Sequence, residues 1–181
     1  IVEPNLEALI KETVKMGSLT VTDVPVASDI YIICVPTPLS ELSDEPRPDI
    51  SFVLNAINSI AVLLKPGDLV IVESTCPVGT ISKIKDKLMG LGVKTADIDI
   101  ACCPERVLPG NILFELIENE RVVGGFTPKA TAAAVKFYKT FVKGAVHGTN
   151  AKTAEMCKLT ENSFRDVNIA FANEVSLICE K

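Results

Sequence analysis

The chain has 181 residues, which is enough for one domain with a packed core. Apolar residues make up 48% of it and the mean hydropathy is +0.33, yet no apolar run reaches the roughly 18 residues that a membrane span requires. The formal net charge of −5 and the scattered Lys and Arg residues argue against a nucleic acid as partner.

Helical and strand patterns alternate along the chain. In the first half we predict a helix over 4–16, strands over 19–22 and 29–35, a proline-rich loop over 36–48, and a helix from Asp49, as its cap, to 64. In the second half we predict strands over 69–73, 98–103, 121–124 and 146–149, and helices over 80–91 and 127–143. The run 29–35 is continuously apolar, so this strand is expected to be buried on both faces.

Strands that alternate with helices of this kind are typical of βαβ units and a parallel sheet. The predicted fold class is therefore α/β, with a doubly wound, Rossmann-like sheet in residues 1–150. Residues 151–181 continue a helical pattern without a break, and a helix of about 30 residues would be roughly 45 Å long. Such a helix usually bridges domains or forms an oligomer interface, so we expect an interdomain and dimerisation helix.

The six cysteines do not have the spacing of a metal site. They form no C-x-x-C pair, and the single histidine, His147, is far from all of them in sequence, so no metal is expected. The cysteines in apolar runs are interpreted as small core residues of a protein in a reducing compartment, the cytoplasm. His147 is expected to be a strand or loop residue, because no partner for a catalytic role is visible.

Three predicted strands end in segments with unusual side chains. Residues 35–38 (VPTP), 74–80 (STCPVGT) and 104–110 (PERVLPG) follow successive parallel strands. Ligands of open parallel sheets bind at the carboxyl ends of the strands, where these hydroxyls, free backbone N–H groups and one carboxylate would gather. Each segment alone could be an ordinary βα turn, but three in succession favour a site.

The long helix offers a second candidate surface. Lys158, Asn162 and Arg165 are spaced i, i+4, i+7 and therefore share one helix face. This face suits an anionic ligand or a developing oxyanion. The alternative is a solvated polar face with Glu155 and Glu161 as neighbours, and spacing alone favours that alternative.

At five segments the sequence resembles the UDP-glucose/GDP-mannose dehydrogenase family. The segments are residues 1–6 (IVEPNL), 35–39 (VPTPL), 73–80 (ESTCPVGT), 103–110 (CPERVLPG) and 153–174 (TAEMCKLTENSFRDVNIAFANE). Glucose-type relatives carry a second Glu where this chain has Pro109. That departure favours UDP-N-acetyl-D-mannosamine as the substrate.

The resemblance implies NAD-dependent oxidation of the C6 alcohol of a UDP-sugar to the uronic acid, in two successive hydride transfers, for polysaccharide biosynthesis. Lys158 is then expected to handle protons and stabilise an oxyanion, a role that a lowered pKa would favour. Carried over by motif, the other implied catalytic residues are Asn162, Glu105, which would activate the hydrolytic water, and Thr75. The implied cofactor contacts are Val35, Thr37 and Thr75. The implied substrate contacts are Arg106, Val107, Lys158, Asn162 and Arg165.

The resemblance also implies that this chain is an internal fragment. The family's first strand, Gly-rich loop, second strand and acidic ribose ligand are expected before Ile1, and the catalytic Cys after Lys181. None of the six cysteines matches that nucleophile, although Cys76 lies at the predicted rim. We therefore expect the isolated chain to be inactive, and to be weakly stable or to associate through an unpaired strand edge.

Two other functions fit the same residues. The rim could hold a nucleotide sugar without catalysis, as a sensor or scaffold. The long helix could also be a structural dimerisation element, compatible with either function, and the expected assembly is a homodimer.

Overall fold

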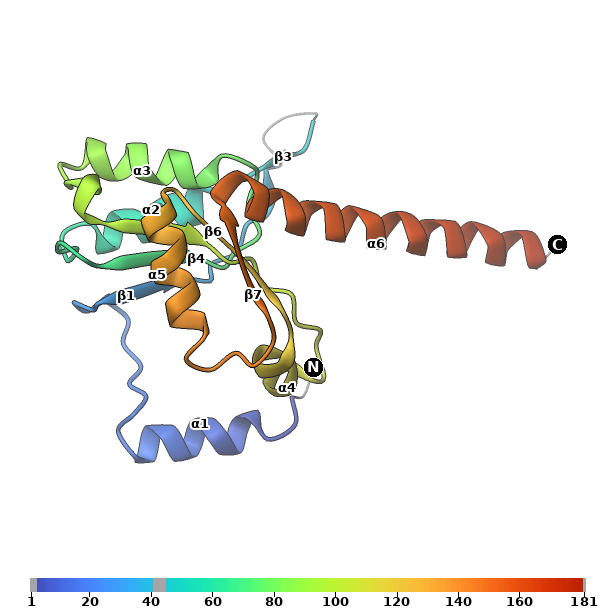
Figure 1. The fold of residues 1–181 in the computed structure, drawn as a ribbon. Helices are drawn as coiled ribbons and strands as arrows, with labels where there is room; N and C mark the ends of the chain where they lie inside the picture. Colours follow the sequence, from blue (N-terminus) through green and yellow to red (C-terminus); the bar gives the residue numbers. More distant parts are fainter. Residues whose placement is uncertain (1–2, 41–44, 181) are drawn as a thin grey trace.

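The computed structural model describes residues 3–40 and 45–180 (Figure 1). A five-stranded sheet forms its centre, in the order β1-β4-β5-β6-β7. These strands are β1 (Ile30–Ile33), β4 (Leu69–Val72), β5 (Asp99–Cys102), β6 (Arg121–Gly125) and β7 (Val146–Asn150). A short antiparallel pair, β2 (Leu39–Ser40) and β3 (Arg47–Pro48), lies in the loop after β1.

Helices flank both faces of the sheet, which confirms the doubly wound α/β prediction (Figure 1). The helices are α1 (Leu6–Lys15), α2 (Ser51–Ile60), α3 (Thr80–Gly90), α4 (Ile112–Glu118), α5 (Pro128–Tyr138) and α6 (Ala151–Cys179), with a 3₁₀ turn, η1, at Thr95–Asp97. Side chains alternate along β4, so Val70 and Val72 pack with α2 and α3, whereas Leu69 and Ile71 pack with α5. The two cores lie on opposite faces of the sheet.

The strand over 29–35 was predicted to be buried on both faces, and this is wrong. In β1, Tyr31 and Ile33 are buried, whereas Ile30 and Ile32 are 37% and 42% exposed. The reason is that only one face of β1, with Tyr31 and Ile33, packs on a core cluster, whereas Ile30 and Ile32 on the other face belong to neither cluster. By contrast, all four residues of β4 and all four of β5 are buried, as central strands require.

The strand predicted over 19–22 does not form, and Val21 is 84% exposed. A strand needs a neighbour that supplies backbone hydrogen bonds, and no strand in the described residues pairs with this segment. The helix predicted over 127–143 ends at Tyr138 and begins, as predicted, with the Thr127 hydroxyl accepting the Ala130 N–H. Asp49 accepts the N–H of Ser51 at the start of α2.

The sheet is not entirely parallel, because β6 runs antiparallel to β5. The sequence pattern did not reveal α4, which lies in the connection between these strands. The chain stays near the end of β5 and re-enters the sheet in the opposite direction (Figure 1). Consequently Arg121, the first residue of β6, lies beside the residues that follow β5, where it contacts Glu105.

The long helix is confirmed as α6, of 29 residues. Asn150 caps it by accepting the N–H of Thr153, and its first turn packs against β6. Gly124 permits this packing, since a Cβ at that position would lie 2.7 Å from the Ala154 Cβ. Beyond its first turns α6 projects away from the sheet (Figure 1). Within the described residues, no helix combines the length and the apolar content needed to cross a membrane.

Candidate functional site

The segments after β1 and β4 are joined by hydrogen bonds. The Ser74 hydroxyl donates to the Val35 carbonyl at 2.7 Å, and the Thr37 hydroxyl donates to the Thr75 carbonyl at 2.7 Å. The hydroxyl of Thr75 is partly exposed, and it makes no hydrogen bond within the part of the chain that the structure describes. The predicted cofactor contacts therefore lie together, and one hydroxyl remains available to a ligand.

The segment after β5 joins the same rim. The N–H of Cys103 donates to the Val72 carbonyl at 3.0 Å, and the N–H of Glu105 donates to the Glu73 carbonyl at 3.2 Å. All three predicted segments thus meet at the carboxyl ends of β1, β4 and β5, as the parallel order of these strands requires.

Glu105 is the carboxylate at the centre of this rim. Its Oε1 accepts the N–H groups of Arg106 and Val107, at 2.5 and 2.9 Å. Its Oε2 accepts a hydrogen bond from Nη1 of Arg121 at 2.9 Å. Both oxygens of the carboxylate are therefore held, one by backbone N–H groups that follow β5 and the other by the side chain at the start of β6.

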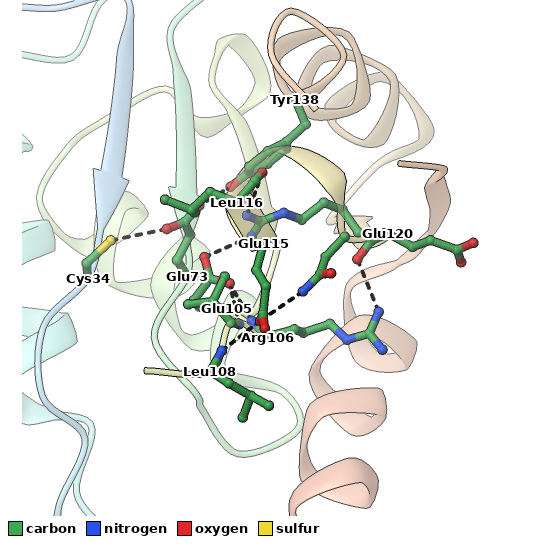
Figure 2. Close-up of polar contacts among 12 residues, drawn as sticks. Cys34, Glu73, Glu105, Arg106, Leu108, Glu115, Leu116, Glu120 and Tyr138 are labelled. Carbon is green, nitrogen blue, oxygen red and sulfur yellow. Dashed lines mark hydrogen bonds and ion pairs between the residues drawn. The ribbon is translucent and has the colours of Figure 1, made fainter. Parts of the chain in front are cut away.

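A polar network extends behind Glu105 (Figure 2). The Tyr138 hydroxyl donates to Glu73 at 2.6 Å, and the Cys34 thiol donates to the other Glu73 oxygen at 3.4 Å. Burial is the main cause that raises the pKa of Tyr138, so this phenol stays protonated. Burial opposes the charge of Arg121, but the hydrogen bond and charge of Glu105 outweigh it and raise the Arg121 pKa.

The predicted face of α6 borders a hollow of about 560 Å³. Its lining residues are Arg106, Lys158, Glu161, Phe164, Arg165, Asn168, Ile169 and Ala172. Arg106 reaches across from the rim and binds Glu161 with two contacts, of 2.6 Å and 3.1 Å. Three cations and one carboxylate therefore face this hollow, which suits an anionic ligand.

The pKa of Lys158 is lowered, in the direction that a proton-exchanging lysine needs. Burial is the largest cause, and the positive charges of Arg165 and Arg106 act in the same direction. The charges of Glu161 and Glu105 oppose the lowering. Lys158 therefore lies within electrostatic reach of Glu105, which links the α6 face to the rim.

Glu155 fixes α6 against the sheet. The sequence left open that Glu155 lies on a solvated polar face, but this is wrong, because Glu155 is only 2% exposed. Its carboxylate accepts the N–H of Gly79 at 2.6 Å and that of Ile81 at 2.9 Å, at the start of α3. Because Glu155 precedes Lys158 by three residues on the same helix, this anchor sets the direction in which Lys158 points.

The remaining predicted residues lie apart from the hollow. Asn162 is exposed and does not line it, and Thr75 lies at the part of the rim between β1 and β4. Within the described part of the chain, no hydrogen bond joins either residue to Lys158 or Glu105.

Sequence reasoning missed Glu73, Arg121, Tyr138 and Glu155. A signal existed for Arg121, a charged residue at the start of the apolar run 121–124, where a buried charge needs a partner. Glu73 also directly follows a buried strand. Tyr138 shows no such signal in the sequence.

The thiols of Cys76 and Cys103 are not activated as nucleophiles. Burial, with a smaller contribution from the Glu155 charge, raises the pKa of Cys76 to about 11. Burial also raises the pKa of Cys103 to about 11. Both thiols are thus protonated at neutral pH, unlike an activated nucleophile. His147 lies in β7 and faces Glu120, with 2.8 Å between Nε2 and Oε2.

Two family models match the chain, and curated proteins resemble it over its whole length. Residues 1–142 match the model of the UDP-glucose/GDP-mannose dehydrogenase family, NAD binding domain, and residues 152–181 match that family's central domain. The chain is 50% identical over 188 residues to a UDP-N-acetyl-D-mannosamine dehydrogenase of Escherichia coli K12, covering 99% of this chain and 44% of that protein. It is 48% identical over 190 residues to an NDP-N-acetyl-D-galactosaminuronic acid dehydrogenase of Ralstonia nicotianae, covering 100% of this chain and 44% of that protein.

Solved structures show the same fold. The structure of a UDP-D-ManNAc dehydrogenase from Pyrococcus horikoshii superposes with a TM-score of 0.91 at 46% identity, covering 98% of this chain and 43% of that one. A GDP-mannose dehydrogenase from Pseudomonas aeruginosa gives a TM-score of 0.79 at 27% identity, covering 96% and 42%. The chain thus spans less than half the length of the relatives it matches.

Proposed function

Because the chain belongs to the UDP-glucose/GDP-mannose dehydrogenase family, we propose that its protein oxidises the C6 alcohol of a UDP-sugar to the uronic acid with NAD, in two successive steps. UDP-N-acetyl-D-mannosamine is the proposed substrate, since several similar proteins bear that name. The observation that carries the proposal is the hollow that Lys158 lines together with Arg106 and Arg165. The pKa of Lys158 is lowered there, and the charge of Glu105 acts on it.

The hydrogen-bonding groups at the rim suit a nicotinamide cofactor. Thr75 offers an uncommitted hydroxyl at the carboxyl ends of two parallel strands, and Val35 and Thr37 lie beside it. These three residues would hold NAD, which supplies a hydride acceptor when bound. Because the Thr37 hydroxyl donates to the Thr75 carbonyl, its proposed part is to fix the loop that presents Thr75.

Lys158 is the proposed proton-handling group. Its lowered pKa makes the neutral amine easier to form, and Nζ in that form can accept the proton of the C6 hydroxyl. Once protonated, the same ammonium stabilises a developing oxyanion. Asn162, one helical turn further along α6, is proposed to donate to that oxygen when the sugar is bound.

Glu105 is proposed to orient the water that hydrolyses the final intermediate. It forms an ion pair with Arg121 and accepts the N–H of Val107. Arg106 and Arg165 are proposed to bind the anionic part of the UDP-sugar, which would compete with Glu161 for Arg106.

The domain boundary proposed from this arrangement is near residue 150. Residues 1–150 supply part of the cofactor domain, and residues 151–181 begin the helix that leads away from it. The free thiols fit a reducing compartment, so the proposed location is the cytoplasm.

The outer part of α6 supports a homodimer. Large apolar side chains repeat along one stripe of the helix and are exposed, at Phe164, Val167, Phe171, Val175 and Ile178. Intervals of three and four residues between them are those of a helix-pairing seam. We propose that two copies pair along this stripe, which size-exclusion chromatography of a Phe171→Asp variant would test by loss of the dimer.

The decisive experiment is NADH formation by the intact protein with a panel of nucleotide sugars. We expect two NADH per UDP-N-acetyl-D-mannosamine. Lys158→Ala should lower kcat by about 10²- to 10⁴-fold, the usual contribution of a positioned acid or base. Lys152→Ala, on the exposed part of the same helix, is the matched control and should stay within about twofold of the wild type.

Other outcomes identify the competing functions. Preference for a nucleotide sugar of the N-acetylgalactosamine series would make that sugar the substrate instead, an outcome that the similarity to the Ralstonia protein favours. Binding of a UDP-sugar in calorimetry without any NADH would indicate a non-catalytic nucleotide-sugar-binding module and would refute the proposed enzyme.

A further inference from the structure

The carboxylate of Glu105 has little freedom to turn. It accepts three hydrogen bonds, two on Oε1 from backbone N–H groups and one on Oε2 from Arg121. An ionised carboxylate offers about four acceptor directions, so one direction on Oε2 remains. The orientation of that last acceptor depends on Arg121, because Arg121 occupies the other position on the same oxygen.

Arg121 is itself held in place from several sides. Its side chain is 1% exposed, its Nη2 donates to the Leu116 carbonyl at 3.4 Å, and its guanidinium lies 5.6 Å from the ring centre of Tyr138. The fork that contacts Glu105 is therefore rigid.

This arrangement is costly if its purpose is stability alone. The Glu105 side chain is 31% exposed, so water could solvate its charge without a buried partner. The buried Arg121 also leaves its Nε without a hydrogen-bond partner in the described residues. Buried ion pairs are weak contributors to stability, because removing both charges from water offsets much of their attraction. What the contact with Arg121 does provide is a fixed orientation of the Glu105 carboxylate.

We propose that Arg121 is a positioning residue for Glu105, and that it aims the free acceptor direction of Oε2 at the reacting water. The inference rests on the proposed function, in which Glu105 acts on that water. Arg121 does not touch the substrate and acts through the carboxylate. The Tyr138 ring supports the guanidinium, whereas the Tyr138 hydroxyl and Glu73 have no part in this proposal.

The test is a double-mutant cycle in the intact protein, with Arg121→Lys, Glu105→Gln and the pair. Arg121→Lys keeps the charge and loses the planar fork. We expect it to lower kcat by about 10- to 100-fold, with KM for NAD and for the UDP-sugar within about threefold, since misplacement of a catalytic group by 1 Å has effects of this size. In the Glu105→Gln background the same change should alter kcat by less than about threefold, because its target is already absent.

Tyr138→Phe is the control, since it removes a buried hydroxyl from the network and leaves the contact between Arg121 and Glu105. It should lower Tm and leave kcat within about twofold. If Arg121→Lys fails to fold, Arg121→Gln, whose shorter side chain loses both the charge and the contact with Oε2, takes its place in the cycle. Multiplicative effects in the cycle, or an unchanged kcat in Arg121→Lys, would overturn the positioning role.

A crystal structure of Arg121→Lys separates this inference from the proposed function. A carboxylate that has turned away from the Val107 N–H supports positioning, and an unchanged carboxylate overturns it, whatever the activity. If no nucleotide sugar yields NADH, the proposed function fails and this structural result alone decides the inference. If Glu105→Gln leaves kcat unchanged in an active protein, the role of Glu105 and the positioning role fail together, although the dehydrogenase activity stands.

Discussion

Removing the Glu155 carboxylate should destabilise the domain more than any exposed change on α6. The carboxylate is buried and accepts the N–H groups of Gly79 and Ile81 at 2.6 and 2.9 Å. A hydrogen bond to a charged group contributes about 1.5–3 kcal/mol, so the two together contribute roughly 3–6 kcal/mol. Burial of the charge offsets part of this. We therefore expect Glu155→Ala to lower the free energy of unfolding by about 3 kcal/mol, near the lower end of that range.

Glu155→Gln should lose about half as much, because its carbonyl oxygen can still accept one N–H while its amide faces the other. Urea denaturation of the intact protein, followed by circular dichroism at one fixed concentration, measures both losses. Glu174→Ala, at an exposed position of the same helix, is the control and should change the free energy by less than about 0.5 kcal/mol.

Hydrogen exchange gives a local measure of the same effect. The Ile81 amide is buried, and in Glu155→Ala it loses its acceptor, so its protection should fall by about 100-fold for a loss of about 3 kcal/mol. If Glu155→Ala costs less than about 1 kcal/mol, or if the protection of Ile81 is unchanged, Glu155 does not anchor α6 to α3.

Three further predictions concern charge, thiol reactivity and the strand edge. Arg165→Gln removes a cation that lowers the pKa of Lys158, so the pH at which kcat reaches half its maximum should rise. Glu161→Gln removes a charge that raises this pKa, so the same pH should fall. Shifts of both variants in the same direction would contradict the proton-handling role of Lys158. Burial of the thiol and the charge of Glu73 raise the pKa of Cys34 to about 12, so iodoacetamide should react slowly with Cys34 at pH 8 and faster as the pH rises. An equal reaction rate in Glu73→Gln would refute the role of that carboxylate. The 181-residue chain should melt at low temperature or self-associate through the unpaired edge of β1, and a cooperative, monomeric melt at high temperature would disprove this.

The local sequence pattern determined the order and type of most elements. Thr127 followed by Pro128 predicted the start of α5, and the buried runs that became β4 and β5 predicted two central strands. These features depend on neighbouring residues, whose spacing and capping chemistry can be read directly from the sequence. The parallel order of those strands then placed the three rim segments together.

The tertiary structure alone decided which surfaces are buried and which charges meet. One face of β1 is exposed because neither core cluster covers it, and the reversed direction of β6 brings Arg121 to Glu105. Glu155 bonds Gly79 and Ile81, which precede it by 76 and 74 residues. Periodicity cannot predict such pairs, because a buried charge is stable only beside a partner that another part of the chain supplies. In the folded protein Glu155 therefore anchors α6, and this anchor positions Lys158 at the proposed site.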